Sequence, residues 1–142
     1  NLVERLARDC QSTADSEALT AQLQHFVHDY SFIQYAYVTD VKGHSTAIAI
    51  SDPGDQKGYK AFPIGFDYSN REWFLQPMRT GKLHITNVHQ SQVTGQLIIT
   101  VSTVITDAND EIIGVLGADI QLEEIIRGAE SLEAEVPNSE EE

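Results

Sequence analysis

The pattern of apolar residues predicts an α+β fold, in which a five-stranded antiparallel sheet packs against helices and a central loop-helix closes over one face. Apolar residues repeat at helical spacing near the N-terminus, and runs of β-branched and aromatic residues separated by turns follow later. Between the runs lies an irregular stretch rich in Gly, Pro, Asp and Lys. With 142 residues, 41% of them hydrophobic, the chain suffices for one core.

The first 30 residues predict two helical pieces. Apolar residues repeat at helical spacing over residues 2–8, and a polar stretch then interrupts them. In the second, long helix, near residues 16–30, Ser16 can serve as the N-cap, and Leu19, Leu23 and Phe26 fall on one face. That face should pack on the sheet. The single cysteine, Cys10, is expected to be a small buried hydrophobic residue.

Five strands are predicted, each bounded by turn residues. Strands near 31–39 and 46–50 form a hairpin, and strands near 83–88, 96–105 and 111–119 form a meander, before a closing helix near Leu122. Residues 51–70 form a long loop, which compact domains seldom contain unless it carries function. A short helix over 71–79 follows, with Asn70 as its N-cap and Gly81 at its left-handed C-terminal end, and Pro77 should strain or shorten it.

Charge and composition exclude some classes of binding partner. The formal net charge of −13 disfavours binding to nucleic acid or to a membrane surface. No apolar run approaches the roughly 20 residues that cross a bilayer, and the chain begins at Asn1, so we expect a fragment whose membrane association comes only through a parent protein. Residues 1–128 should form one domain, and the Glu- and Ser-rich residues 129–142 a flexible tail or linker.

Neither an enzyme nor a metal or cofactor protein is expected. The histidines lack the spacing of a zinc site, no nucleophile elbow occurs, and the acidic residues at 107–111 fit a turn. Two charged residues stand out instead. Arg71, at a helix start and two residues before Trp73, suits a carboxylate, although a structural salt bridge and a core Trp are the alternative. On a strand, alternation places Asp119 on the same face as Ile113, Val115 and Gly117, so if that face is buried its carboxylate needs a cationic partner. The alternative is that Asp119 caps the closing helix.

Several blocks of the sequence resemble the Cache or PDC family of PAS-like sensor domains. They are YAYVTD at 35–40 with Gly43, FDYSNREWF at 66–74, Ile85-Thr86, TGQLIITVS at 94–102 and GVLGADI at 114–120. The resemblance extends from about residue 17 to residue 127. It implies a PAS-like sheet with a long N-terminal helix and a ligand pocket under the central loop-helix, in a module of the single-module type.

The resemblance also implies a ligand site and a biological role. Ligand contacts are expected from Arg71, Trp73, Phe74, His89, Asp119, Phe66 and Tyr68. In the subset of the family that binds amino acids, Arg71, Trp73 and Asp119 match, whereas Phe66, Phe74 and His89 stand where that subset has tyrosine. The expected ligand is therefore an amino acid or another small carboxylate, or an amine.

Family members are typically extracytoplasmic, periplasmic parts of chemoreceptors, histidine kinases and diguanylate cyclases, and often pair through the N-terminal helix as homodimers. A sensor domain is thus the expected function and no enzymatic activity is expected. The alternative is a structural or dimerisation module in which Arg71 and Asp119 form a buried salt bridge. A soluble, cytoplasmic parent is the alternative for its location.

Overall fold

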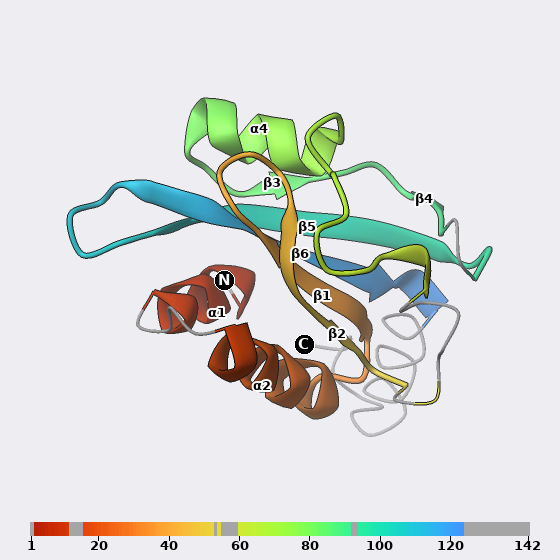
Figure 1. Ribbon diagram of the computed structural model, residues 1–142. Coiled ribbons are helices and arrows are strands. Elements are labelled where there is room, and N and C mark those ends of the chain that lie inside the picture. Colours follow the sequence, from red (N-terminus) through yellow and green to blue (C-terminus); the bar gives the residue numbers. More distant parts are fainter. Residues whose placement is uncertain (1, 12–15, 53, 55–59, 92–93, 124–142) are drawn as a thin grey trace, which may run out of the picture.

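An antiparallel sheet forms the middle layer of the molecule, with helices on both faces (Figure 1). The computed structural model describes residues 2–11, 16–52, 54, 60–91 and 94–123. The helices are α1 (Leu2–Cys10), α2 (Ser16–Asp29) and α4 (Glu72–Thr80). The strands are β1 (Ile33–Thr39), β2 (Ser45–Ile50), β3 (His84–Ile85), β4 (His89–Gln90), β5 (Leu97–Thr106) and β6 (Ile112–Gln121). The predicted α+β class is confirmed.

The sheet has the strand order β2-β1-β6-β5-β3, and β4 pairs with β5 on the same side as β3. The predicted strand at 83–88 is therefore two short pieces, which makes six strands in five positions. Thr86 lies at the break. Its backbone N–H donates to the Thr100 carbonyl at 2.9 Å, and its hydroxyl accepts the Thr100 N–H at 2.9 Å. This hydroxyl replaces a backbone carbonyl, so the regular ladder stops there.

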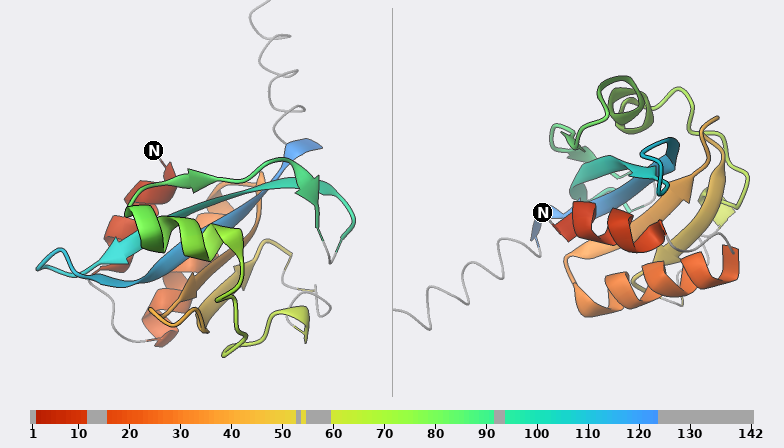
Figure 2. Two further views of the ribbon diagram at one scale, coloured as in Figure 1. Left: turned by 90° about the horizontal axis from the view of Figure 1, so that it is seen from above. Right: turned by 90° about the vertical axis from the view of Figure 1, so that its left-hand side faces the viewer.

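Helices α1 and α2 cover one face of the sheet, opposite α4 (Figure 2). Leu19, Leu23 and Phe26 of α2 are buried, as the helical spacing predicted. The predicted burial of Cys10, on α1, is also confirmed. Burial, and next the charge of Asp9, raises the pKa of its thiol to about 12, so it stays protonated at neutral pH.

Helix α4 follows the long loop and lies on the opposite face. The proposed N-cap was wrong by one residue. Arg71 occupies that position without a side-chain cap, because a turn closed by the Arg71 N–H to the Tyr68 carbonyl, 2.9 Å, takes up Asn70. Gly81 ends the helix at φ 71°, as predicted, and its N–H donates to the Pro77 carbonyl at 2.7 Å. The helix continues through Pro77.

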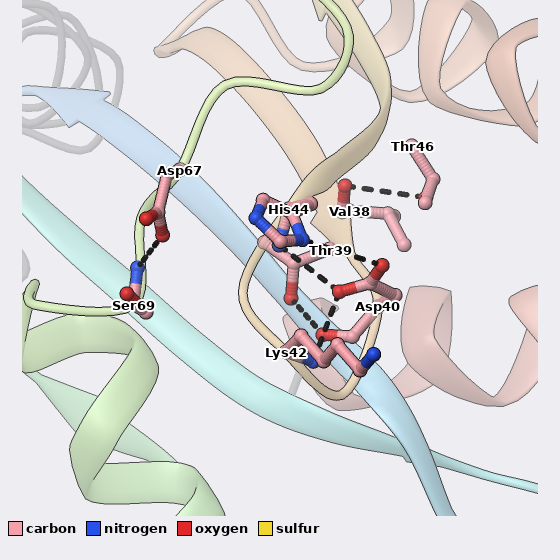
Figure 3. Close-up of polar contacts among 8 residues, drawn as sticks. All are labelled: Val38, Thr39, Asp40, Lys42, His44, Thr46, Asp67 and Ser69. Carbon is pink, nitrogen blue, oxygen red and sulfur yellow. Dashed lines mark hydrogen bonds and ion pairs between the residues drawn. The ribbon is translucent and has the colours of Figure 1, made fainter.

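The turn between β1 and β2 contacts the end of the long loop through an isolated antiparallel bridge between His44 and Asp67. Figure 3 shows these two segments and the polar contacts within each. The Asp40 carboxylate accepts the backbone N–H groups of Lys42 at 2.9 Å and His44 at 3.0 Å. Gly43, at φ 92°, accepts the Tyr68 N–H on its carbonyl at 2.8 Å. A Cβ at Gly43 would come within 2.8 Å of the Cα atom of Ser69. Only glycine therefore permits this contact, which fixes the backbone of Tyr68.

Strand β6 continues to Gln121, and Leu122 and Glu123 are helical, as expected for the start of a closing helix. The boundary near residue 128 and the proposed tail at 129–142 lie outside the described residues. Among the described helices, none is both long and apolar enough to cross a membrane.

Candidate functional site

A cavity of about 110 Å³ lies between the sheet and the segment formed by the long loop and α4. Five of the seven predicted site residues line it: Tyr68, Arg71, Trp73, His89 and Asp119. Six further residues were not predicted: Tyr37, Phe62, Gln90, Ser91, Ile98 and Thr100. The wall therefore combines aromatic rings, hydroxyl groups and two opposite charges.

Asp119 is the buried charge of the cavity. It lies on β6 with Val115 and Gly117 on the same face, as strand alternation predicted, and the residue is 9% exposed. Ile113, predicted on this buried face as well, is 43% exposed, because the pairing of β5 and β6 shifts register there and interrupts the alternation. The alternative role as a helix N-cap was wrong, because β6 runs two residues beyond it. The Tyr37 hydroxyl donates a short hydrogen bond to its carboxylate, and the Thr100 hydroxyl donates another at 2.9 Å.

The expected cationic partner of Asp119 is replaced by these two hydroxyl groups. Among the residues that the structure describes, no ion pair reaches this carboxylate. Burial raises its pKa above the usual 3.8, while the hydrogen bonds from Tyr37 and Thr100 and the more distant His89 act in the opposite direction. The site thus holds an acidic group whose ionised form has no ion-pair partner among the described residues.

Three aromatic rings pack above Asp119. The ring centroids of Tyr37 and Trp73 are 4.8 Å apart, those of Tyr68 and Trp73 5.0 Å, and those of Tyr37 and Tyr68 5.7 Å. Burial, and then the charge of Asp119, raises the pKa of Tyr37 and of Tyr68, which keeps both hydroxyls protonated. The Tyr68 hydroxyl is buried and has no hydrogen-bond partner among the described residues. It is a donor available to a bound molecule.

Arg71 brings a partly exposed positive charge to the same cavity. It sits at the N-cap position of α4, where its extended backbone, φ −83° and ψ 140°, precedes the helical turn. A guanidinium at this place offers a planar pair of donors to a carboxylate. The cavity therefore presents a cationic group from α4 and an anionic group from the sheet.

Phe66 and Phe74, also predicted to contact a ligand, do not line the cavity. Phe74 is 5% exposed and packs in the aromatic core between α4 and the sheet. Its position next to Trp73 turns it about 100° around the helix, away from the cavity. Phe66 packs edge to face with Phe62 at 5.8 Å and against Tyr68 at 4.8 Å, so it supports two residues that do line the cavity.

His89 contributes from the edge of the sheet. Its Nδ1 atom lies 2.9 Å from the Asn87 carbonyl and must therefore carry the proton of that hydrogen bond. The side chain is exposed, and it lines the outer wall of the cavity with Gln90. Within the described ranges, no group of three or more His, Cys, Asp and Glu side chains is placed to hold a metal ion.

The raised pKa of Asp119 predicts a pH dependence of the ligand-free domain. Because the folded-state pKa exceeds the unfolded one, this carboxyl contributes its full stability below the unfolded pKa and loses it as the pH rises through the raised value. The melting temperature of Asp119→Asn should therefore gain on that of the wild type from about pH 4 toward neutrality. Thermal melts over this range measure it, and a gap that widened toward acid would contradict it.

The fold and the cavity define a PAS-like small-molecule sensor domain: an antiparallel sheet with its cavity between one face and a loop-helix segment. A family model described as the first PDC sensor domain of methyl-accepting chemotaxis protein-like proteins matches residues 16–127. The chain belongs to this family. The family and the sensor function suggested by the sequence blocks at 66–74 and 114–120 are confirmed.

Two curated proteins show where related sequences occur. A segment of the citrate (Re)-synthase of Syntrophus aciditrophicus is 41% identical over 118 residues, which are 83% of this chain and 19% of that protein. The methyl-accepting chemotaxis protein McpA of Pseudomonas putida is 23% identical over 125 residues, 88% of this chain and 18% of McpA. The chain thus spans about a fifth of the curated relatives that it matches.

Solved chemoreceptor domains share the fold. The ligand-binding domain of Campylobacter jejuni Tlp3, in complex with 4-methylisoleucine, superposes with a TM-score of 0.69 at 20% identity, covering 87% of this chain and 50% of that one. That of Pseudomonas fluorescens CtaA, in complex with L-leucine, gives 0.65 at 25% identity, covering 89% and 50%. That the parent protein contains a single module of this kind stays a prediction.

Proposed function

We propose that this sensor domain binds a small α-amino acid in the cavity between the sheet and α4. The Asp119 carboxylate accepts hydrogen bonds from the ammonium group of the ligand, and the Arg71 guanidinium binds the ligand carboxylate. The hydroxyls of Tyr37, Thr100 and Tyr68 orient the ammonium end, and Trp73 covers the bound molecule. Solved relatives are complexes with such compounds: CtaA with L-leucine, L-serine or L-alanine, and Tlp3 with L-valine.

The single observation that carries this proposal is the environment of Asp119. The carboxylate is buried, has two hydroxyl donors, and lacks a cationic partner among the described residues. An uncompensated buried carboxylate is costly, and a ligand ammonium placed beside it would remove that cost. The alternative of a structural module rests on a buried salt bridge between Arg71 and Asp119, and no such pair occurs in the described part of the chain.

Thermal melts with a matched panel test the proposal. The panel contains L-alanine, L-serine, L-valine and L-leucine, together with ethylamine and propionate, which each carry one of the two charged groups. At least one amino acid should raise the melting temperature, since a ligand at a hundred times its Kd stabilises the folded state by about 2.7 kcal/mol. Ethylamine and propionate should have much smaller effects. Stabilisation by propionate alone, or by none of the six compounds, would contradict the proposal.

We further propose that the parent protein places this domain outside the cytoplasm, as a chemoreceptor does, and that the domain itself performs no catalysis. Its similarity to chemotaxis proteins supports the first point. The match to citrate (Re)-synthase covers 19% of that enzyme, so its activity is not carried over to this chain. Pairing of two copies through α2 remains a prediction, and sedimentation at high protein concentration measures it.

A further inference from the structure

We propose that Ser102 is a positioning residue of the ligand site, which together with Pro77 fixes where α4 places Trp73 and Arg71. The inference rests on the proposed binding function but concerns residues outside the cavity wall. Ser102 lies on β5 and is fully buried, and Pro77 lies in the interior of α4. Neither lines the cavity.

Pro77 leaves one helical carbonyl without its usual partner. In an α-helix, the N–H of each residue donates to the carbonyl four positions earlier, so residue 77 would serve Trp73. Proline has no N–H and cannot make this bond. The carbonyl of Trp73, in the first turn of a nine-residue helix, therefore needs a donor from elsewhere.

Ser102 supplies that donor. Its hydroxyl donates to the Trp73 carbonyl at 2.7 Å, and the bond is buried. It joins the first turn of α4 to strand β5, at the helix end that carries Arg71 and Trp73. Because Pro77 offers no N–H, the Trp73 carbonyl bonds to Ser102 instead, and this bond attaches the helix to the sheet.

The sheet also leaves space for the indole beside this bond. Gly117 pairs with Ser102 on one side and with Tyr37 on the other. A Cβ at Gly117 would come within 3.2 Å of Trp73 Cε3, so the indole lies close over this glycine. Ser102 fixes the backbone of Trp73 while Gly117 admits its ring, and the two set the position of the cavity wall.

Removal of the hydroxyl tests this role, with fluorescence as the readout. Trp73 is the single tryptophan of the chain, so its emission and its quenching by acrylamide report on this position alone. In Ser102→Ala, acrylamide quenching in the ligand-free protein should increase. The Kd of the amino acid that stabilises the wild type, measured for L-alanine, L-serine, L-valine and L-leucine, should rise about five- to tenfold, the loss of one hydrogen bond.

A restored helical donor should reverse the effect. In the double variant Ser102→Ala with Pro77→Ala, residue 77 regains an N–H for the Trp73 carbonyl, and both quenching and Kd should return toward wild type. Thr103→Ala is the matched control. It removes a neighbouring buried side chain on the opposite face of β5, and it should leave Trp73 quenching unchanged even if the domain becomes less stable.

The outcomes separate this inference from the proposed function. Unchanged quenching in Ser102→Ala, or a failure of Pro77→Ala to rescue it, would overturn the positioning role. Should Ser102→Ala fail to fold, Ser102→Cys keeps a weak donor and should show the same changes in smaller measure. If none of the four amino acids binds the wild type, the proposed function fails, while the ligand-free quenching experiment still decides the role of Ser102.

Discussion

Asp119→Asn is expected to abolish the thermal stabilisation by amino acids while the ligand-free domain melts at or above the wild-type temperature. The amide still accepts hydrogen bonds from Tyr37 and Thr100, but it offers no charge to an ammonium group. The substitution also removes a buried carboxylate that has no ion-pair partner in the described part of the chain. Arg71→Ala should abolish stabilisation likewise, through loss of the carboxylate contact. Thermal melts with and without the amino acids of the panel measure both effects.

An aspartate remote from the cavity, Asp107, serves as the control for Asp119→Asn and Arg71→Ala. Asp107 lies in the turn between β5 and β6 and accepts backbone N–H groups of Asn109 and Glu111. Asp107→Asn should keep the full response to amino acids. A structural salt bridge between Arg71 and Asp119 would give the opposite pattern, since breaking a buried ion pair costs about 3–5 kcal/mol. If both variants melted far below the wild type without any ligand, the binding role would have to be abandoned.

Gly117→Ala is expected both to destabilise the domain and to remove ligand binding. The added methyl group would overlap Tyr37 Cε2, come within 3.0 Å of Tyr37 Cδ2 and approach the Trp73 ring. Neither ring is free to move, because Tyr37, Trp73 and Tyr68 pack against one another. Overpacking of this kind costs about 1–3 kcal/mol. Displacement of Tyr37 would also withdraw its hydroxyl from Asp119.

Chemical unfolding and the amino acid panel together measure the effect of Gly117→Ala. Gly54→Ala is the matched control, because among the described residues a Cβ there would meet the Asp52 carboxylate at an ordinary contact distance of 3.4 Å and no other group. It should change neither stability nor binding by a measurable amount. A Gly117→Ala domain with wild-type stability and an undiminished response would show that the aromatic rings can shift without consequence for the site.

Local sequence patterns predicted most of the helices and strands, and they predicted the residues that β6 contributes to the face with the cavity. Period-two alternation placed Asp119, Gly117 and Val115 together because it depends only on the strand itself. Helical spacing placed Leu19, Leu23 and Phe26 of α2 on the buried side for the same reason. The guanidinium of Arg71 was also found, since a cation near a helix start is a local signal.

Contacts between distant strands could not be predicted in this way. Tyr37 reaches Asp119 across 82 residues of sequence, because β1 pairs with β6 rather than with β2 alone. Alternation within β1 gives the face of Tyr37 but not the neighbouring strand. Thr100 meets Asp119 through the register of β5 and β6. The break at Thr86 depends on a side chain that competes with the backbone, which apolar periodicity does not reveal.

The strand that holds Asp119 is also the strand by which the chain leaves the sheet. β6 ends at Gln121, two residues beyond the carboxylate. The Gln121 N–H donates to the Phe32 carbonyl at 2.8 Å, in the short segment between α2 and β1. A shift of Asp119 would therefore pass through two peptide units to Gln121, and through its hydrogen bond to the segment that follows α2.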